Sequence, residues 1–166
     1  VLDRLTGKPL TEVIRKAAPN GGVEPSERAK PPLTERDMWG MSPIDQMLCR
    51  IQFRQASYAG IYTPPNTKQP WIQYPGYNGG SDWGGVAIDT KQRIILANYN
   101  DIPNYNRLIP RAETDELLLS EKAGSHAALA PQKGAPYGID VNAGWRMPFT
   151  QLLCKEPPYG GIRAIN

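Results

Sequence analysis

Val86-Ala87-Ile88-Asp89-Thr90-Lys91-Gln92-Arg93-Ile94-Ile95-Leu96-Ala97 is the stretch that indicates the fold of this chain most clearly. Two short runs rich in apolar residues, 86–88 and 93–97, are separated by the polar residues 89–92. Runs of this kind, with a four-residue loop between them, are typical of a β-hairpin. The stretch therefore predicts two antiparallel strands joined by a loop at 89–92.

Further strand-like runs lie on both sides of this hairpin. Residues 1–10 predict a strand, a tight turn and a strand, because Asp3 can accept main-chain hydrogen bonds and Gly7 allows a positive φ. We also interpret residues 137–141 and 160–165 as strands. The chain is therefore expected to be mainly β.

Two short helices are expected among the strands. Ser42, Pro43 and Asp45 predict a helix start with Ser42 as N-cap, and the helix should end near Gly60. The apolar residues at helical spacing after this start predict one buried stripe, made of Ile44, Met47, Leu48 and Ile51.

The second expected helix is shorter. It spans residues 114–122, with Thr114 as its N-cap and a stop at Gly124. The Pro- and Gly-rich residues 19–32 predict a loop, and residues 98–111 are dense in Asn, Tyr and Pro. The stretch 19–32 shows no helical or strand period.

Composition limits the classes of function. The 16 glycines and 17 prolines among 166 residues are about a fifth of the chain, against a usual share of about 12%. A net charge of +3 without a Lys/Arg block argues against nucleic-acid binding. No apolar run approaches the ~20 residues of a membrane helix. Val1 begins without an initiator Met or a signal peptide, so we expect a segment of a longer chain.

Metal-ligating and nucleophilic residues are scarce. One histidine and two cysteines give no recognisable zinc-ligand spacing. His126 lies in the Ala-, Gly- and Ser-rich stretch 122–131, which predicts a surface loop. We interpret His126 as an exposed loop residue rather than as the partner of a cysteine nucleophile.

The stretch 74–85 is the best candidate for a binding surface in the residue pattern alone. It combines aromatic rings, amides and the Asp82 carboxylate with glycines that allow a ligand to approach the main chain. The alternative is structural, with the glycines in turns, Trp71 and Trp83 in the core, and Asp82 capping a turn. Composition leaves both interpretations open.

Several longer motifs occur in one order along the chain. They are Asp37-Met38-Trp39-Gly40, Asp45-Gln46-Met47-Leu48-Cys49-Arg50, Tyr58-x-Gly60-x-Tyr62-Thr63-Pro64-Pro65, Tyr74-Pro75-Gly76-Tyr77-Asn78-Gly79-Gly80-Ser81-Asp82-Trp83-Gly84, Ala97-Asn98-Tyr99-Asn100, Arg107-Leu108-Ile109-Pro110-Arg111, Pro136-Tyr137-Gly138 and Cys154-Lys155-x-Pro157-Pro158-Tyr159-Gly160. With these motifs the chain resembles the membrane-bound, pyrroloquinoline-quinone (PQQ)-dependent dehydrogenases of the glucose/quinate/shikimate family over nearly its whole length.

The resemblance implies part of an eight-bladed quinoprotein β-propeller, that is, a run of blades with one or two short helices in insertions. Residues 1–166 would be a fragment of this propeller domain. Residues 1–18 would end one blade, 19–36 would form a loop or linker, and 37–166 would hold further blade strands with long insertions. Residues 20–30 depart from the family, because they look shorter and more charged than its Pro-Thr-Gln-Pro stretch.

The resemblance also implies the cofactor site. PQQ would be contacted by Asp82, Trp83 and Asn98, since an amide can donate to quinone oxygens and an indole offers a flat apolar contact. Asn100, Arg107 and Arg111 are candidates for binding the substrate or the cofactor's carboxylates. For the two arginines, the alternative is an ordinary exposed or loop-bracing role.

No catalytic residue and no metal ligand can be carried over onto this chain. The family's catalytic Asp, its PQQ-contacting Lys and its neighbouring His match sequence before Val1. The ligands of the divalent cation beside PQQ, Mg²⁺ or Ca²⁺, are expected outside the chain as well. The fragment should therefore be inactive alone.

The resemblance implies oxidation of a small polyol or hydroxy acid, with electrons passed to ubiquinone on the periplasmic side of the bacterial inner membrane. Membrane attachment would come from other parts of the parent protein. Residues 74–80 and 98–105 resemble the quinate/shikimate branch, which ranks quinate or shikimate first, another polyol second and glucose third. The rival hypothesis is a non-catalytic sugar- or polyol-binding β module.

The resemblance also implies that Cys49 and Cys154 face the periplasm, where disulfide bonds persist. We predict that they pair. The alternative is that Cys49 is a free, buried packing residue, because it lies in the expected helix off the Ile44 stripe. Sequence does not show whether the two Cα atoms lie within the ~7 Å that a disulfide requires.

Overall fold

The structure, a computed structural model, describes residues 2–13, 32–61, 63–77, 85–120 and 127–165. The chain divides into two compact units, Val1–Pro31 and Pro32–Asn166. The division falls inside the stretch 19–36 that the sequence assigns to a linker. The assignment of residues to particular blades stays a prediction.

The described part of the first unit is a tight turn. The Asp3 carboxylate accepts hydrogen bonds from the main-chain N–H groups of Leu5, at 3.0 Å, and Thr6, at 2.7 Å. These bonds, first of all the one from Thr6, hold the pKa of Asp3 below its ordinary value. Gly7 has a φ of +68°. The predicted turn is therefore confirmed, but its strands amount to one antiparallel bridge between Leu2 and Pro9.

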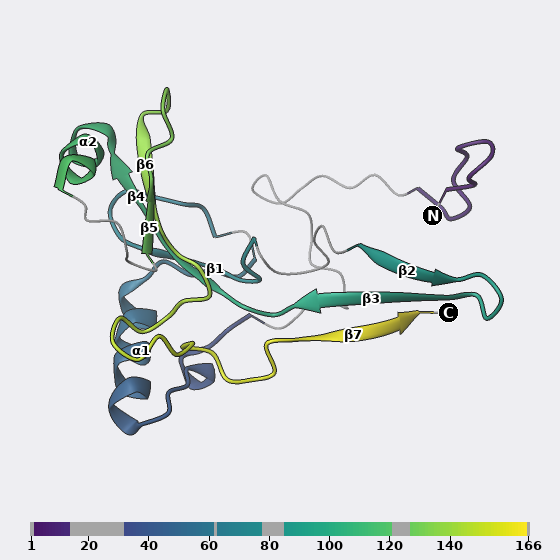
Figure 1. Cartoon of the computed structure of the whole chain (residues 1–166), viewed down its shortest axis with the longest axis horizontal. Coiled ribbons are helices and arrows are strands. Elements are labelled where there is room, and N and C mark those ends of the chain that lie inside the picture. Colours follow the sequence, from purple (N-terminus) through teal and green to yellow (C-terminus); the bar gives the residue numbers. More distant parts are fainter. Residues whose placement is uncertain (1, 14–31, 62, 78–84, 121–126, 166) are drawn as a thin grey trace. The chain divides into compact units, whose positions relative to one another are not determined.

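The predicted hairpin belongs to a three-stranded antiparallel sheet in the order β2-β3-β7 (Figure 1). Its strands are β2 (Val86–Asp89), β3 (Ile94–Asn100) and β7 (Gly160–Ile165). Asp89 pairs with Ile94, so the loop is 90–93, one residue later than expected. The Asp89 carboxylate closes it by accepting from the N–H groups of Lys91 and Gln92. The hairpin and the strand at 160–165 are confirmed.

A second sheet has four antiparallel strands in the order β1-β4-β6-β5. They are β1 (Trp71–Gln73), β4 (Asn104–Pro110), β5 (Ala127–Ala130) and β6 (Tyr137–Asn142). Only β6 was predicted as a strand. Residues 127–130 were predicted to be loop, which is wrong, because they pair with residues 139–142. His126 lies outside the described residues.

Helix α1 (Pro43–Gln55) begins where the sequence predicts, with the Ser42 hydroxyl accepting from the Asp45 N–H at 3.1 Å. It ends at Gln55, five residues before Gly60. The predicted buried stripe is wrong, because Ile44, Met47 and Ile51 are 65%, 52% and 43% exposed and Leu48 is half-buried. The helix instead turns Cys49 and Phe53 toward the core.

Helix α2 (Arg111–Ser120) begins three residues earlier than expected, so Thr114 is inside the helix and is not its N-cap. Thr114 is completely buried, with its hydroxyl 3.0 Å from the carbonyl oxygens of both Ile109 and Pro110. The same hydroxyl accepts from the Gly138 N–H on β6. Its polar group therefore joins α2 to the sheet. Gly124, the predicted stop, lies outside the described residues.

The core lies between α1, the four-stranded sheet and the segment 145–154. Trp145 is fully buried at its centre, and its ring stacks on Tyr105 at 5.2 Å and on Phe53 at 6.4 Å between centroids. Its indole N–H donates to the Gln52 side-chain oxygen at 2.7 Å. The other buried members are Leu33, Met38, Cys49, Ile72, Tyr74, Met147 and Cys154.

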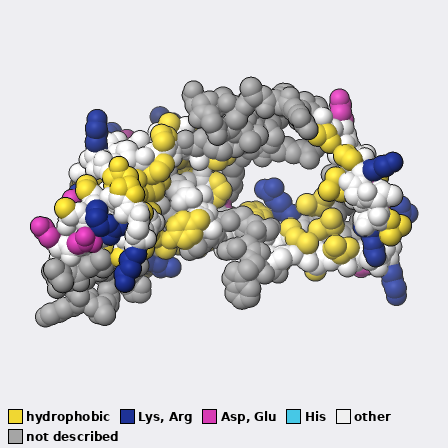
Figure 2. All heavy atoms as spheres, turned by 90° about the horizontal axis from the view of Figure 1, so that it is seen from above, with side chains coloured by type: hydrophobic (Ala, Val, Ile, Leu, Met, Phe, Trp, Pro, Cys, Tyr) yellow, Lys and Arg dark blue, Asp and Glu magenta, His cyan; other side chains and the backbone are white. Residues whose placement is uncertain are grey.

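The expected mainly β class is confirmed, with two helices accompanying the two sheets in the described residues. Neither α1 nor α2 has both the length and the apolar character that crossing a bilayer requires. Hydrophobic side chains lie at the surface in several places (Figure 2).

Candidate functional site

Asn98 and Asn100 lie near the end of β3, and the structure brings their side chains to one face of the three-stranded sheet. They are two residues apart in a strand, and side chains at that spacing point to the same side. Asn98 pairs with Ile162 of β7 and Asn100 with Gly160. Both asparagines are exposed. The strand therefore presents two amide groups together on an open sheet face.

Asp82 and Trp83 lie outside the described residues. The described residues on either side of them are Tyr77 and Gly85. Val86 pairs with Ala97, the neighbour of Asn98. The proposed cofactor contacts of Asp82 and Trp83 therefore stay predictions.

Arg107 lies on β4, in the other sheet. Its guanidinium forms an ion pair with Glu113 of α2 at 3.4 Å, and both side chains are nearly half exposed. It also stands opposite Asp140 of β6. Burial raises the pKa of Asp140, and the Arg107 charge opposes that rise. None of these described contacts reaches Asn98 or Asn100.

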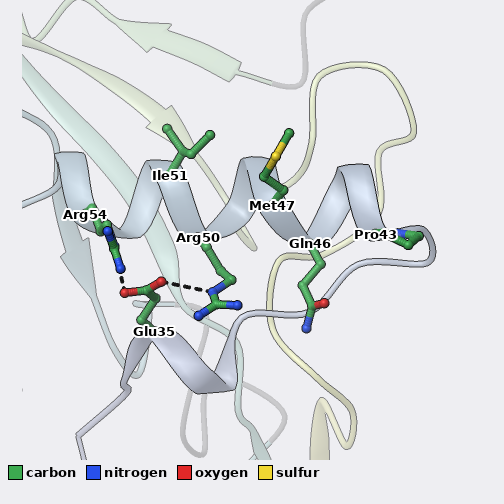
Figure 3. A pocket seen from close by; sticks show the side chains of 7 residues that line it. All are labelled: Glu35, Pro43, Gln46, Met47, Arg50, Ile51 and Arg54. Atoms are coloured by element: carbon green, nitrogen blue, oxygen red, sulfur yellow. Dashed lines mark hydrogen bonds and ion pairs between the residues drawn. The ribbon is translucent and has the colours of Figure 1, made fainter.

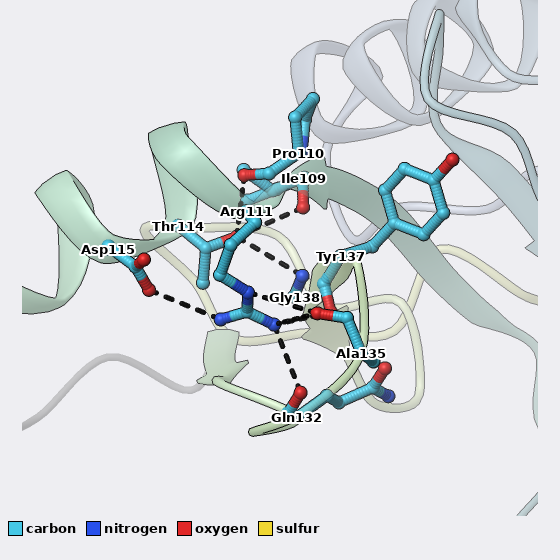
Figure 4. A network of polar contacts seen from close by, with 9 residues as sticks. All are labelled: Ile109, Pro110, Arg111, Thr114, Asp115, Gln132, Ala135, Tyr137 and Gly138. Carbon is cyan, nitrogen blue, oxygen red and sulfur yellow. Dashed lines mark hydrogen bonds and ion pairs between the residues drawn. The ribbon is translucent and has the colours of Figure 1, made fainter.

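Arg111, the first residue of α2, braces a loop (Figure 4). Its guanidinium donates to the main-chain carbonyl oxygens of Gln132, Ala135 and Tyr137 at 2.9–3.1 Å. A further Nη bond of 3.2 Å reaches the Asp115 carboxylate. These contacts favour the loop-bracing alternative over carboxylate binding, because most of the guanidinium donors already have partners.

Sequence reasoning missed a buried polar cluster around Asp101, the residue after β3. The Tyr74 hydroxyl donates to Asp101 Oδ1 at 2.7 Å, and Lys155 Nζ lies 3.3 Å from Asp101 Oδ2. Burial, then the hydrogen bond to Asp101, raises the pKa of Tyr74 far above its ordinary value. Both Tyr74 and Asp101 lie in or beside motifs that the sequence singles out, but nothing in their spacing indicates that they meet.

A pocket of about 370 Å³ lies along α1 and the 3-10 turn η2 (Glu35–Asp37) (Figure 3). Glu35 accepts from Arg54 Nε at 2.7 Å and from Arg50 Nε at 2.9 Å. These bonds, first of all the one from Arg54, hold the pKa of Glu35 below its ordinary value. None of the candidate cofactor residues lines this pocket.

Cys49 and Cys154 form a disulfide bond, with 5.4 Å between their Cα atoms. Both residues are fully buried. The bond joins α1 to the segment that leads through Lys155 to β7. The structure therefore contains the predicted pairing rather than a free Cys49 thiol.

The described residues could form only a part of a PQQ site. An amide both donates and accepts hydrogen bonds, which suits the quinone and carboxylate oxygens of PQQ, and Asn98 and Asn100 offer two such groups on one face. Within the described ranges, no three His, Cys, Asp or Glu side chains gather where a metal ion could be held.

Two antiparallel sheets make up most of the regular structure in the described residues, and β3 ends with two asparagines on one face. These features define a β-sheet protein. Residues 1–166 match the PQQ family model described as "Glucose/ethanol/alcohol dehydrogenase, beta-propeller domain". The chain therefore belongs to this family of PQQ-dependent β-propeller proteins. The recognition of a quinoprotein dehydrogenase from sequence is confirmed.

Curated relatives agree with this assignment. The chain is 45% identical to the glycerol dehydrogenase large subunit of Gluconobacter oxydans (strain 621H), over all of this chain and 25% of that protein. It is 34% identical to the quinate/shikimate dehydrogenase (quinone) of Acinetobacter baylyi and 34% to the quinoprotein glucose dehydrogenase of Escherichia coli K12, over all of this chain and 22% of each. The chain thus spans about a quarter of the length of these relatives. No solved structure matched it.

Proposed function

We propose that this chain is part of a PQQ-dependent dehydrogenase that oxidises a small alcohol and passes the electrons to a quinone. Family membership over residues 1–166 supports the activity, and the shared face of Asn98 and Asn100 supports a contribution to the cofactor site. When bound, PQQ supplies the acceptor for two electrons from the substrate carbon. Asp82, Trp83 and Asn98 would bind and orient it, and Asn100 would lie beside it or the substrate.

The substrate class that we propose is a small polyol or hydroxy acid. Motif resemblance favours quinate or shikimate, whereas the 45% identical relative is named for glycerol. An acyclic polyol therefore joins quinate and shikimate as a leading candidate, ahead of glucose. The acceptor that we propose is ubiquinone, on the periplasmic side of the bacterial inner membrane, with Mg²⁺ or Ca²⁺ held by residues outside this chain.

The test is reconstitution of the full-length parent protein with PQQ and Mg²⁺ or Ca²⁺, followed by dye reduction with glycerol, quinate, shikimate and glucose. We expect activity with at least one of the first three and none after the metal is chelated. Residues 1–166 alone should be inactive and should not retain PQQ on gel filtration. Failure of every substrate in the loaded parent would favour the non-catalytic polyol-binding module instead.

A further inference from the structure

Three segments that are distant in sequence meet at the Asp101 carboxylate. The Tyr74 hydroxyl and the Lys155 ammonium bind its two oxygens at 2.7 Å and 3.3 Å. Tyr74, Asp101 and Lys155 are buried, with 4%, 6% and 8% of each residue exposed. We call these three residues the Asp101 network.

Main-chain bonds join the same three segments. The Asp101 N–H donates to the Tyr159 carbonyl at 2.9 Å, and the Gly76 N–H donates to the Ile102 carbonyl at 2.8 Å. Lys155 Nζ also donates to the carbonyl oxygens of Glu156, at 2.9 Å, and Pro158, at 3.2 Å. The Lys155 ammonium therefore binds both the Asp101 carboxylate and the turn that leads into β7.

Each of these segments leads to a residue proposed to contact the cofactor or to the strand beside it. Asp101 directly follows Asn100 and lies three residues after Asn98 on the same chain. Tyr74 opens the motif that contains Asp82 and Trp83. Lys155 precedes β7, whose residues Gly160 and Ile162 pair with Asn100 and Asn98.

The chemistry of the Asp101 network makes it rigid. If the buried carboxylate moved away from its charged partner or its hydroxyl donor, a buried polar group would be left uncompensated, which is costly. The carboxylate is therefore held in one position. The neighbouring disulfide between Cys49 and Cys154 anchors Lys155 to α1 and the core. The end of β3 is thereby attached to the best-packed part of the chain.

We propose that Tyr74, Asp101 and Lys155 are positioning residues for the cofactor site, acting by holding the Asn98–Asn100 end of β3 and the described residues 74–77 at a fixed separation. The proposal rests on the proposed function, since it needs PQQ to bind beside Asn98. The network itself is too buried to touch the cofactor in the described structure.

The first test measures PQQ affinity of the full-length apoprotein by titration, followed by absorbance, with no substrate present. Tyr74→Phe removes one donor, and the double variant Asp101→Asn/Lys155→Met removes both charges together so that neither is left unpaired. We expect each to weaken PQQ binding about tenfold, which is the size of effect that substitutions acting on a site through intervening residues have. The single variant Lys155→Arg, which keeps the charge, should retain more of the affinity than the double variant does.

The matched control is Thr114→Val, which removes an equally buried hydroxyl from the junction of α2 and β6. It should lower the melting temperature about as much as Tyr74→Phe but leave PQQ affinity unchanged. If Thr114→Val weakens PQQ binding as much as Tyr74→Phe does, the network is only structural and the proposal fails.

A double-mutant cycle with Asn98→Ala tests whether the network acts through β3. We expect Tyr74→Phe to weaken PQQ binding much less in the Asn98→Ala background than in the wild type. Fully additive losses would overturn the proposed route. A wild-type parent that does not bind PQQ would instead overturn the proposed function, whereas wild-type affinity in both network variants would overturn this inference alone.

Discussion

The two sheets of this chain differ in how much of their apolar surface the chain itself covers. The four-stranded sheet lies with α1 around a core in which Trp145, Ile72 and Cys49 are fully buried. The three-stranded sheet exposes apolar side chains on both faces, with Ile162 on one and Ile88, Ile95 and Ile165 on the other. One region therefore supplies its own packing, and the other has faces that further chain could cover.

The candidate cofactor residues lie in the less covered region. Asn98 and Asn100 share a face with Ile162. Stability within these 166 residues should therefore depend on the core around Trp145, whereas function in the full-length protein should depend on the open sheet. Each prediction below changes residues of one region and measures the property that is expected to depend on that region.

The largest effect should come from Trp145→Ala. Loss of a fully buried aromatic side chain costs about 3–5 kcal/mol, and here the stacking on Tyr105 and the bond to Gln52 are lost with it. We expect a fall of that size in the free energy of unfolding of the 166-residue chain, measured by denaturant titration. Phe149→Ala, at a 92% exposed position, is the control and should change little. Equal effects would mean that the core is not where the structure shows it.

The second prediction concerns the disulfide between Cys49 and Cys154. It closes a separation of 105 residues, and bonds over loops of that kind stabilise by about 2–4 kcal/mol, below the ~4–5 kcal/mol of the chain-entropy model. The double variant Cys49→Ala/Cys154→Ala should lose that much stability. Alkylation of denatured, unreduced protein should label no thiols. Two labelled thiols by mass measurement would show that the cysteines are free.

The third prediction moves to the open sheet. In the full-length enzyme, Asn98→Ala should lower kcat/KM by about 5- to 150-fold, which corresponds to about 1–3 kcal/mol for a hydrogen-bond partner left unpaired. The melting temperature should stay within a degree or two, because Asn98 is exposed in this chain. Asn66→Ala, in a loop outside both sheets, serves as the control. Wild-type kinetics for Asn98→Ala would remove this residue from the site.

A smaller effect is expected from Ile162→Ser. The side chain is 77% exposed, so the stability of the 166-residue chain should change by less than about 0.5 kcal/mol. Self-association, followed by light scattering, should nevertheless decrease, because an exposed apolar sheet face promotes it. Leu5→Ser, at an exposed position in the first unit, should have less effect. Equal decreases would show that the sheet face does not drive association.

The last prediction concerns how stability depends on pH above neutrality. The folded-state pKa of Tyr74 is raised, so its contribution to stability is complete below the ordinary value of 10.0 and is lost as pH rises above it. Unfolding free energies measured from pH 8 to 11 should therefore fall less steeply above pH 10 in Tyr74→Phe than in the wild type. The control is Tyr77→Phe, at an exposed position. Identical slopes in the two variants would contradict the raised pKa.

Local features were the ones that the sequence predicted well. The turn at Asp3, the hairpin of β2 and β3 and the N-cap at Ser42 each depend on residues a few positions apart. Strand β4 escaped prediction because its asparagines look like loop residues. Asn104 and Asn106 are nevertheless buried, and residues distant in sequence bind their side chains: the Gly144 N–H donates to Asn104 Oδ1 at 3.0 Å, and Asn106 Nδ2 donates to Gln73 Oε1 at 3.4 Å.

By itself, the sequence determined the family, the mainly β class and the start of the first helix. Long motifs and short-range hydrogen bonds depend only on residues that are close together in the sequence. Tertiary structure decided which face of α1 is buried. The Cys49–Cys154 bond and the packing of Phe53 on Trp145 place the Cys49 side of that helix against the core and leave the Ile44 stripe on the outer side. It also decided that Tyr74 and Lys155 meet at Asp101, because contacts between residues 27 to 54 positions apart depend on how the chain folds back on itself.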